Sequence, residues 1–384
     1  MPESIPAAAP QMFPSLDSLE SVLWPGVALA VFVVTAVIVD LMILLATRWR
    51  LVDLPNRRSA HVLPTARGGG VAIVLVTTLA AIGVVFRWPQ FATNILVGVC
   101  LPCLAIAGVG IVDDIRPLRA TLRLIIQIAV GVAMTAVLGP LDGIAIPGLP
   151  TVHLGWLGWP LTVLWIVGMT NAFNFMDGSD GMAGLAAVTS GAVLAAIGWQ
   201  LRWHPELLMA ALAAAAAAGF LMFNWQPARV FMGDVGSAFL GTYLAAMPLL
   251  FPEPQRSFVI VPAVLGLWPF IFDPLVSVIR RIANGKNPMV PHREFLFHRL
   301  IRSGVSHAAT AAIYAALAVA GGMVGMLMLA DWPPAGLRTG GPLVVAGLAV
   351  ALACGIEWRC SRVGLTATGG LPQAAGGQPA AASK

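Results

Sequence analysis

Five carboxylates and one carboxamide carry the motifs in this chain that are best suited to chemistry. Asp113 and Asp114 form an adjacent pair that directly follows a long uncharged segment. Two like charges this close repel each other, and a divalent cation or a cationic group beside them relieves the repulsion. Asp234 stands in the segment Phe-Met-Gly-Asp-Val-Gly-Ser, at the expected start of an apolar helix, where its carboxylate, the helix N-terminal amides and a phosphate could converge. The competing structural interpretations are helix-end solvation for the pair and an N-terminal cap for Asp234.

The segment that runs from Asn171 to Gly184 adds three polar side chains at intervals of three residues, Asn174, Asp177 and Asp180. In a helical turn these side chains would be neighbours, and the glycines between them permit a tight turn and the close approach of a ligand. The spacing resembles a calcium-binding loop. The EF-hand pattern fails, however, because Val188 occupies the position of the closing acidic residue.

Two basic segments accompany the acids, one before residue 70 and one near residue 295. Arginine binds phosphate oxygens in bidentate fashion, and histidine can donate or relay a proton, so segments rich in both suit phosphoryl substrates. Anchoring by the positive-inside rule is the competing interpretation for most of these residues. The basic site candidates in these two segments are His61, Arg67, His292, Arg293, His298 and Arg299.

The composition of the chain is that of a membrane protein. Of its 384 residues, 58% are hydrophobic and only 10% are charged, and the mean hydropathy is +0.86. Soluble domains carry about a quarter charged residues, so the composition excludes an ordinary soluble enzyme. The net charge of +5 indicates membrane topology rather than a nucleic-acid partner. Cys100 and Cys103 form an isolated C-x-x-C, which we interpret as buried apolar packing rather than a redox or metal site.

The elements that must position the motifs are membrane-spanning helices. A bilayer core about 30 Å thick needs about 20 apolar residues per helix. This criterion predicts an all-α polytopic membrane protein with about eleven transmembrane helices, near residues 25–47, 70–87, 94–112, 124–140, 157–170, 183–200, 206–223, 236–251, 258–279, 307–330 and 341–357. Pro147, Pro150 and Pro160 argue against one continuous helix through 143–176.

The basic residues predict the orientation of these helices. Alternate loops, together with the C-terminal tail, hold 18 of the 22 basic residues, and the other set holds only Arg87, Arg202, Arg256 and Arg338. The positive-inside rule then places the N-terminus in the periplasm, and the C-terminus and all the acidic motifs in the cytoplasm. The predicted organisation is a periplasmic segment 1–24, a membrane domain 25–357 and a disordered cytoplasmic tail 358–384.

The same motifs, taken in order, resemble those of the polyprenyl-phosphate N-acetylhexosamine-1-phosphate transferases. They read D-x-P-N-x-R-x-x-H and P-x-x-R-G-G, then the Asp pair, then N-A-x-N-F-x-D-G-x-D-G-x-A-G, then F-M-G-D-x-G-S, and last H-R-x-x-x-x-H-R-L. The resemblance covers about residues 51–300. This family includes bacterial enzymes that initiate O-antigen and enterobacterial common antigen synthesis, and the muramoyl-pentapeptide transferase of peptidoglycan synthesis.

The resemblance implies that undecaprenyl phosphate attacks the β-phosphate of a UDP-N-acetylhexosamine, which yields undecaprenyl-diphospho-HexNAc and UMP. It implies Mg²⁺, with Mn²⁺ as a substitute ion, bound by Asn174 and Asp234. The implied catalytic residues are Asp113, Asp114, Asp177 and His292. The implied substrate-binding residues are Asp180 for the uridine, Arg123 as a phosphate clamp in the place of a frequent family lysine, and Arg293, His298, Arg299, Arg67 and His61.

One departure from the family pattern favours an enzyme of polysaccharide initiation at the cytoplasmic (inner) membrane. The muramoyl-pentapeptide transferases carry an H-H-H-x-x-E segment where this chain has His292-Arg-Glu. The donor candidates are the UDP forms of N-acetylglucosamine, N-acetylfucosamine and N-acetylquinovosamine. The expected partners are this donor, undecaprenyl phosphate and the lipid bilayer, with a homodimer as the candidate assembly.

Two alternatives lie outside catalysis. A secondary transporter would explain why Asp40 and Asp273 lie within apolar segments. Both residues precede expected helix ends, however, and the two halves of the chain show no clear repeat. A scaffold protein that kept the fold without activity is the other alternative.

Overall fold

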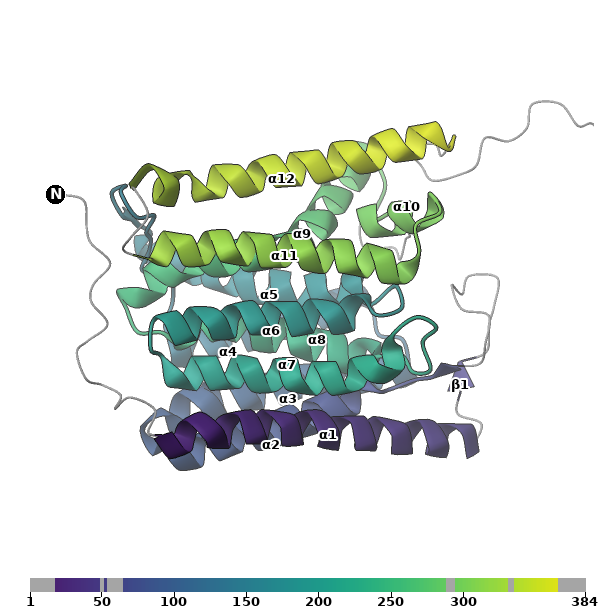
Figure 1. Ribbon diagram of the computed structural model, residues 1–384, viewed down its shortest axis with the longest axis horizontal. Helices are drawn as coiled ribbons and strands as arrows, with labels where there is room; N and C mark the ends of the chain where they lie inside the picture. The colour runs from purple at the N-terminus through teal and green to yellow at the C-terminus, as the bar shows by residue number, and fades with distance from the viewer. Residues whose placement is uncertain (1–17, 49–51, 54–64, 288–293, 331–334, 365–384) are drawn as a thin grey trace, which may run out of the picture.

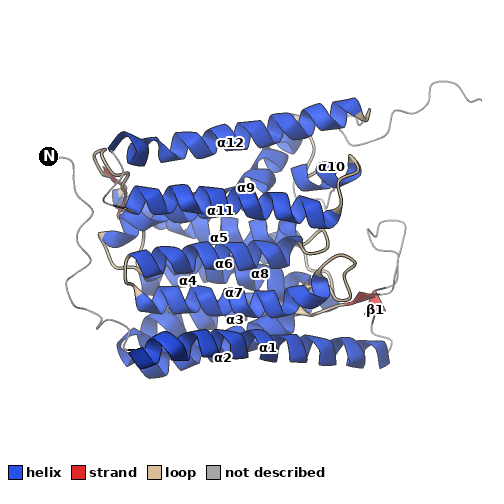
Figure 2. Cartoon of the chain, viewed as in Figure 1, coloured by secondary structure: helices blue, strands red, loops and turns tan. Residues whose placement is uncertain are grey.

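The computed structural model describes residues 18–48, 52–53, 65–287, 294–330 and 335–364, and within these ranges the chain is a bundle of helices that run roughly parallel (Figures 1 and 2). A membrane interior offers no water to backbone groups, and helices satisfy those groups internally. The helices are α1 (Ser18–Arg48), α2 (Gly70–Arg87), α3 (Leu101–Ile115), α4 (Ala120–Leu138), α5 (Gly158–Met176), α6 (Met182–Gln200), α7 (His204–Asn224), α8 (Gly233–Ala246), α9 (Gln255–Ala283), α10 (Leu296–Arg302), α11 (His307–Leu329) and α12 (Ala335–Arg362).

Short irregular elements complete the described chain. A π-helical stretch, Thr93–Cys100, leads into α3. Two antiparallel pairs of two-residue strands lie at opposite ends of the bundle, β1 (Val52–Asp53) with β2 (Thr65–Ala66), and β3 (Gly143–Ile144) with β4 (Val152–His153). The second pair lies in the proline-containing segment before α5, so the expected break in 143–176 is confirmed.

Nine helices in the described ranges are long and apolar enough to cross a membrane, and they match nine of the predicted spans. The other two predicted spans, 157–170 and 236–251, coincide with α5 and α8. At 1.5 Å per residue the 14 residues of α8 cover only about 21 Å. Every residue from Val235 to Ala246 is buried, because other helices enclose α8. The chain is thus a multi-pass membrane protein, while the count of eleven spans stays a prediction.

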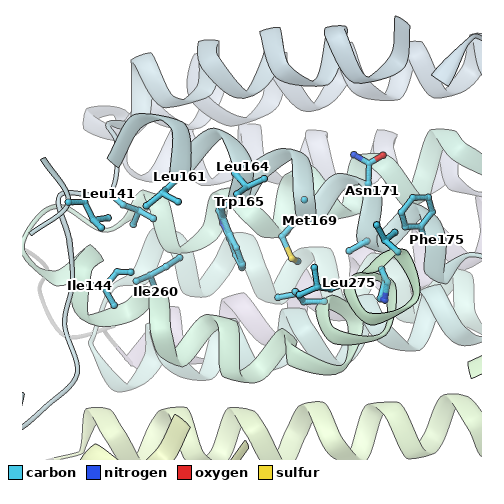
Figure 3. A pocket seen from close by; sticks show the side chains of 16 residues that line it. Leu141, Ile144, Leu161, Leu164, Trp165, Met169, Asn171, Phe175, Ile260 and Leu275 are labelled. Atoms are coloured by element: carbon cyan, nitrogen blue, oxygen red, sulfur yellow. The ribbon is translucent and has the colours of Figure 1, made fainter. Parts of the chain in front are cut away.

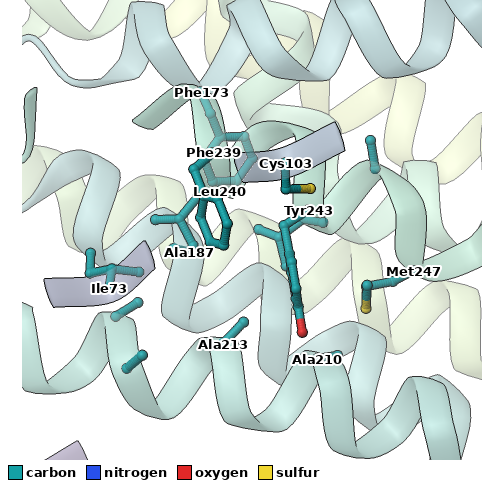
Figure 4. Close-up of a cluster of buried hydrophobic side chains, with 14 of the residues drawn as sticks. Ile73, Cys103, Phe173, Ala187, Ala210, Ala213, Phe239, Leu240, Tyr243 and Met247 are labelled. Carbon is teal, nitrogen blue, oxygen red and sulfur yellow. The ribbon is translucent and has the colours of Figure 1, made fainter. Parts of the chain in front are cut away.

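α8 lies at the centre of the bundle and packs against α2, α3 and α5. Its residues Phe239, Leu240 and Tyr243 form the middle of a buried cluster (Figure 4). Cys103 of α3 packs in the same cluster, and both it and Cys100 are buried free thiols, as the sequence predicted. The Tyr243 hydroxyl donates to the backbone oxygen of Met209 at 3.2 Å, which satisfies a polar group in this apolar core.

Two boundaries differ from the predicted ones. α1 begins at Ser18 rather than near residue 25, because Pro25 is accommodated inside the helix. α12 continues to Arg362, so residues 358–362, which the sequence assigned to a disordered tail, are helical. Cys360 contacts α10 and Arg359 contacts Ser303 directly after it, tertiary interactions that composition does not reveal.

The helices alternate in direction, so all the described motifs gather at one end of the bundle, which we call the motif end (right in Figure 1). The C-terminal ends of α1, α3, α5, α7 and α9 meet the N-terminal ends of α2, α4, α6, α8 and α11 there. Arg87, Arg202, Arg256 and Arg338 all lie at the opposite end. The separation of basic residues therefore agrees with the structure in the described ranges, and the side of the membrane that each end faces stays a prediction.

Candidate functional site

The N-terminus of α8 is held by two carboxylates from other helices. Asp114 of α3 accepts the backbone N–H groups of Asp234 and Val235 at 3.1 and 3.2 Å. Asp177, which follows α5, accepts the N–H of Gly233 at 3.1 Å. These three amides are therefore satisfied by protein and do not face a phosphate, contrary to one expectation from the sequence. The capping interpretation of Asp234 is also wrong, because the N-cap residue is Met232 and Asp114 supplies the capping oxygens.

Gly233 makes the approach of Asp114 possible. Its φ of +76° lies in the left-handed region, which side chains other than glycine rarely adopt. A Cβ atom at this position would lie 2.6 Å from Asp114 Oδ2. The glycine of the Phe-Met-Gly-Asp motif is thus required both for the turn into α8 and for the contact that fixes the helix start.

Arg123, in the first turn of α4, bridges two of the predicted site carboxylates. Its Nη1 lies 2.5 Å from Asp113 Oδ2 and 2.8 Å from Asp234 Oδ2. About a third of the Arg123 side chain is exposed, so the guanidinium remains accessible from the motif end. Asp113 also accepts the backbone N–H of Leu118, which holds the turn between α3 and α4. The sequence identified all three charged residues but not this bridge.

Asn174 and Ser237 link α5 to α8 beside this bridge. The Asn174 Nδ2 donates to Ser237 Oγ at 3.1 Å, and Ser237 Oγ donates to the backbone oxygen of Gly233 at 3.0 Å. Asn174 also lowers the pKa of Asp234. The predicted pair of metal ligands, Asn174 and Asp234, therefore lies at the same contact between α5 and the start of α8.

Two acidic groups of the site, Asp234 and Asp177, have raised pKa values. Burial raises the pKa of Asp234 to about 7, and the neighbouring Asp113 adds to the rise. Burial raises the pKa of Asp177 well above its usual range, and the charges of Asp234 and Asp114 raise it further. Arg67 opposes this effect on Asp177. Carboxylates crowded in this way favour the approach of a cation.

The segment before α8 is fixed by residues from two of the motifs and by Asn224 at the end of α7. Asp180 Oδ2 accepts the N–H of Ala228 at 3.1 Å, so one oxygen of the residue predicted to face uridine is already used. Asn224 accepts from Gly181 N and donates to the backbone oxygen of Val230, which ties the Asp177–Asp180 loop to this segment. The stretch around Arg67 pairs with the same segment through three backbone hydrogen bonds, namely Phe231 N to Ala66 O, Gly69 N to Phe231 O and Gly70 N to Met232 O. Arg67, which is exposed, is thereby brought to the site.

His298 and Arg299, adjacent in α10, point in different directions. A Cβ atom on Gly178 would lie 2.9 Å from His298 Nε2, so the imidazole lies against the loop between Asp177 and Asp180. The Arg299 side chain is only 4% exposed and donates to Glu357 of α12 at 2.7 Å. We therefore correct the expectation that Arg299 contacts substrate, because its guanidinium is buried on the far face of α10. His61, His292 and Arg293 lie outside the described residues.

The residues present suit a hard divalent cation in their chemistry. In the described part of the chain, no three histidine, cysteine or acidic side chains are already arranged around a metal position. Mg²⁺ commonly uses only one or two protein carboxylates and takes its remaining ligands from water and substrate phosphates. Asp234, Asn174 and Asp177 supply carboxylate and amide oxygens of this kind, so the donor set fits.

Asp273 and Asp40, the two carboxylates that suggested transport, have structural partners. Asp273 is fully buried in α9 and accepts the N–H groups of Leu296 and Phe297 and the hydroxyl of Tyr314. It therefore caps α10 and is not an open ion site. Asp40 lies on the surface of α1, with its side chain 47% exposed, 3.9 Å from Arg229. Neither residue lines an ion path in the described structure.

A multi-helix membrane bundle with acidic residues and arginine gathered at one end defines a membrane enzyme suited to phosphate-bearing substrates. Comparison with known proteins shows its family: the family model described as "Glycosyl transferase family 4" matches residues 95–251. A protein of Bacillus subtilis named "Probable undecaprenyl-phosphate N-acetylglucosaminyl 1-phosphate transferase" is 33% identical over 261 residues, which cover 67% of this chain and 71% of that protein. The chain belongs to the polyprenyl-phosphate N-acetylhexosamine-1-phosphate transferase family.

Two further relatives show how far the likeness extends. The decaprenyl-phosphate N-acetylglucosaminephosphotransferase of Mycolicibacterium smegmatis is 28% identical over 291 residues, which cover 68% of this chain and 71% of that protein. A phospho-N-acetylmuramoyl-pentapeptide-transferase of a Synechococcus strain is 34% identical over 195 residues, but these cover only 47% of this chain and 54% of that protein. The chain thus aligns over more of its length with the N-acetylglucosamine-phosphate transferases.

Proposed function

We propose that this protein transfers a HexNAc-1-phosphate from a UDP-N-acetylhexosamine to undecaprenyl phosphate. An oxygen of the lipid phosphate forms a bond to the β-phosphorus of the donor, and the bond from that phosphorus to the α–β bridging oxygen breaks. The bridging oxygen leaves with UMP, and the lipid keeps the new diphosphate with its sugar. We further propose that this reaction starts cell-envelope polysaccharide synthesis, with the motif end at the cytoplasmic face of the inner membrane.

The observation that carries the proposal is the Arg123 bridge between Asp113 and Asp234. It joins one cation to two carboxylates at the point where three helices meet. Phosphoryl transfer between two anions requires positioned cations and oxygens more than a protein nucleophile. Arg123 would bind a phosphate of the substrates, and Asp113 would orient Arg123 for that contact. Asp114 would act indirectly, by holding the start of α8 and hence Asp234.

An apolar cavity beside the site supports a lipid substrate. Its volume is about 500 Å³, and it lies between α5 and α9 (Figure 3). It extends from Leu141 and Ile144, near the opposite end of the bundle, to Asn171 and Phe175. Asn171 lies one helical turn before Asn174, so the cavity leads toward the acidic residues. A polyprenyl chain in this cavity would present its phosphate at the motif end.

Mg²⁺ would be held by Asp234 and Asn174, with Asp177 adjacent, and when bound it would neutralise charge on the diphosphate. The chain's own residues account for the remaining steps. His298, against the Asp177–Asp180 loop, would donate a hydrogen bond to the donor diphosphate or sugar, and Arg67 would add a second cationic contact. Asp180, through its oxygen that does not bind Ala228, would contact the uridine.

The second candidate within the family is phospho-N-acetylmuramoyl-pentapeptide transfer. Relatives of that name favour it, and their similarity covers about half of this chain. The His-Arg-Glu sequence in place of an H-H-H-x-x-E segment weighs against it. A panel of UDP-linked donors decides between the two, because each enzyme releases UMP only from its own donor.

The test is UMP release by the purified protein with undecaprenyl phosphate and Mg²⁺. We expect release that requires the lipid, and an Asp234→Asn variant with turnover lower by at least about a hundredfold, as expected for a contact used in the transition state. The matched control is Asp40→Asn, an exposed acid of α1, which retains turnover. No UMP from any donor, together with substrate flux in proteoliposomes, would overturn the proposal in favour of transport.

A further inference from the structure

The last two turns of α12 hold α10 by polar contacts. Glu357 Oε2 accepts a hydrogen bond from Arg299 Nη2 at 2.7 Å. Arg359 Nε donates to Ser303 Oγ at 2.9 Å, and Cys360 Sγ lies 3.8 Å from the backbone oxygen of Arg299. The contacts reach the middle of α10 and the residue that follows it. α12 therefore fixes both the side chain and the backbone of this short helix.

Apolar packing adds to the same contact. Ile356 and Cys360 of α12 form a buried cluster with Leu296 and Leu300 of α10. These two α10 residues are four apart and lie on one face of the helix, and Arg299, three residues after Leu296, also reaches α12. The opposite face, which carries His298, is left to point toward the motifs.

Glu357 joins three helices through one carboxylate. Besides Arg299 of α10, it accepts a hydrogen bond from Arg280 Nη1 of α9 at 2.7 Å. The Arg299 side chain is 4% exposed, whereas that of Glu357 is 42% exposed. Without the Glu357 charge, a buried guanidinium would face a second arginine with no counter-charge between them, so α10 would shift to let Arg299 reach water.

A shift of α10 would move His298, which this helix carries. The imidazole and the ring of Phe297 lie against Gly178, where a Cβ atom would come within 2.9 Å of His298 Nε2 and 3.3 Å of the Phe297 ring. Gly178 stands between Asp177 and Asp180, both of which hold the segment that leads into α8. The position of His298 in the site is thus coupled to α10 and, through Arg299, to α12.

We infer that Glu357 is a positioning residue of the transferase site, which acts through Arg299 to keep His298 against the Asp177–Asp180 loop. This inference rests on the proposed function, in which His298 contacts the sugar-nucleotide donor. It assigns a role in the reaction to a residue of the last helix, beyond the part of the chain that the family model matches.

The experiment compares Glu357→Gln with the parent protein in steady-state kinetics for both substrates. We expect the KM for the UDP-N-acetylhexosamine to rise about tenfold, as for a displaced binding group, and the KM for undecaprenyl phosphate to stay unchanged. The matched control is Arg362→Gln, which removes a charge from the same end of α12 at a side chain that stacks on Trp358 and not on α10. This control should keep both KM values.

A double-variant cycle separates positioning from general destabilisation. Because Glu357 acts through His298, the Glu357→Gln, His298→Ala double variant should have the same donor KM as His298→Ala alone. Multiplied effects, or equal changes in both KM values, would overturn the inference. Amide hydrogen exchange gives a readout that does not depend on activity: exchange at residues 296–302 should increase in Glu357→Gln while α11 is unchanged. Unchanged exchange there would also overturn the inference, whereas an inactive parent protein would instead contradict the proposed function.

Discussion

The carboxylate of Asp114 accepts the backbone N–H of Asp234 at 3.1 Å, although the two residues lie 120 positions apart in the chain. The contact places the Asp pair of α3 directly against the start of α8. It gives Asp114 a defined task, because an oxygen acceptor at a helix N-terminus satisfies amides that the helix itself leaves without partners. Asp113, its neighbour, has the different task of binding Arg123.

Replacing Asp114 by Asn tests this capping role. The amide retains only one acceptor oxygen for two N–H groups and loses the charge that favours a helix N-terminus, so we expect a loss of about 1–2 kcal/mol in stability. Thermal unfolding of the detergent-purified protein measures it, with Asp142→Asn, an exposed acid at the opposite end, as the control. Unchanged stability together with abolished turnover would show that Asp114 acts on substrate directly.

Gly233→Ala should damage the same contact from the other side. The new methyl group would lie 2.6 Å from Asp114 Oδ2 on a backbone with φ of +76°, so we expect a loss of more than about 1 kcal/mol. Gly83→Ala in α2 is the control, because nothing lies within 4 Å of a Cβ there. Equal unfolding temperatures for the two variants would contradict the geometry described for the turn into α8.

Arg123→Lys and Arg123→Gln together test the bridge. A lysine retains the charge but not the planar set of donors, so kcat/KM should fall about tenfold, and the neutral glutamine should lower it at least about a hundredfold. UMP release with both substrates varied gives the values. A glutamine variant with the kcat/KM of the parent would show that Arg123 serves only to hold α3, α4 and α8 together.

The helical fold was largely predictable because a membrane-spanning helix requires a run of about 20 apolar residues, which is visible in the sequence. The candidate site residues could also be recognised, because an apolar chain has few charged residues and these lie at the ends of the predicted helices. The sequence identified Asp113, Asp114, Arg123 and Asp234 as site candidates, and the structure brings them together, but the sequence could not assign which of them bonds the others. That assignment depends on how α3, α4 and α8 pack, and this packing leaves no local pattern.

The contacts of α10 show most clearly what the sequence alone cannot predict. Arg299 looked like a substrate ligand because it belongs to a His-Arg-Leu motif, yet its partner, Glu357, lies 58 positions later in a segment on the border of the predicted tail. Asp273 looked like an intramembrane ion site and proves to be the cap of α10. A buried arginine or aspartate can serve either as a ligand or as a structural contact. Only its partner in the folded chain decides between the two roles.

The most direct test of the central claim follows the β-phosphate of the donor. The purified protein is incubated with undecaprenyl phosphate, Mg²⁺ and a UDP-N-acetylhexosamine labelled at the β-phosphorus, and the label is then measured in the lipid and aqueous phases. We expect the label to enter the lipid in equal amount to the unlabelled UMP released. Label that remains in water-soluble UDP while the sugar moves to the lipid would contradict it, because the sugar alone would then be transferred.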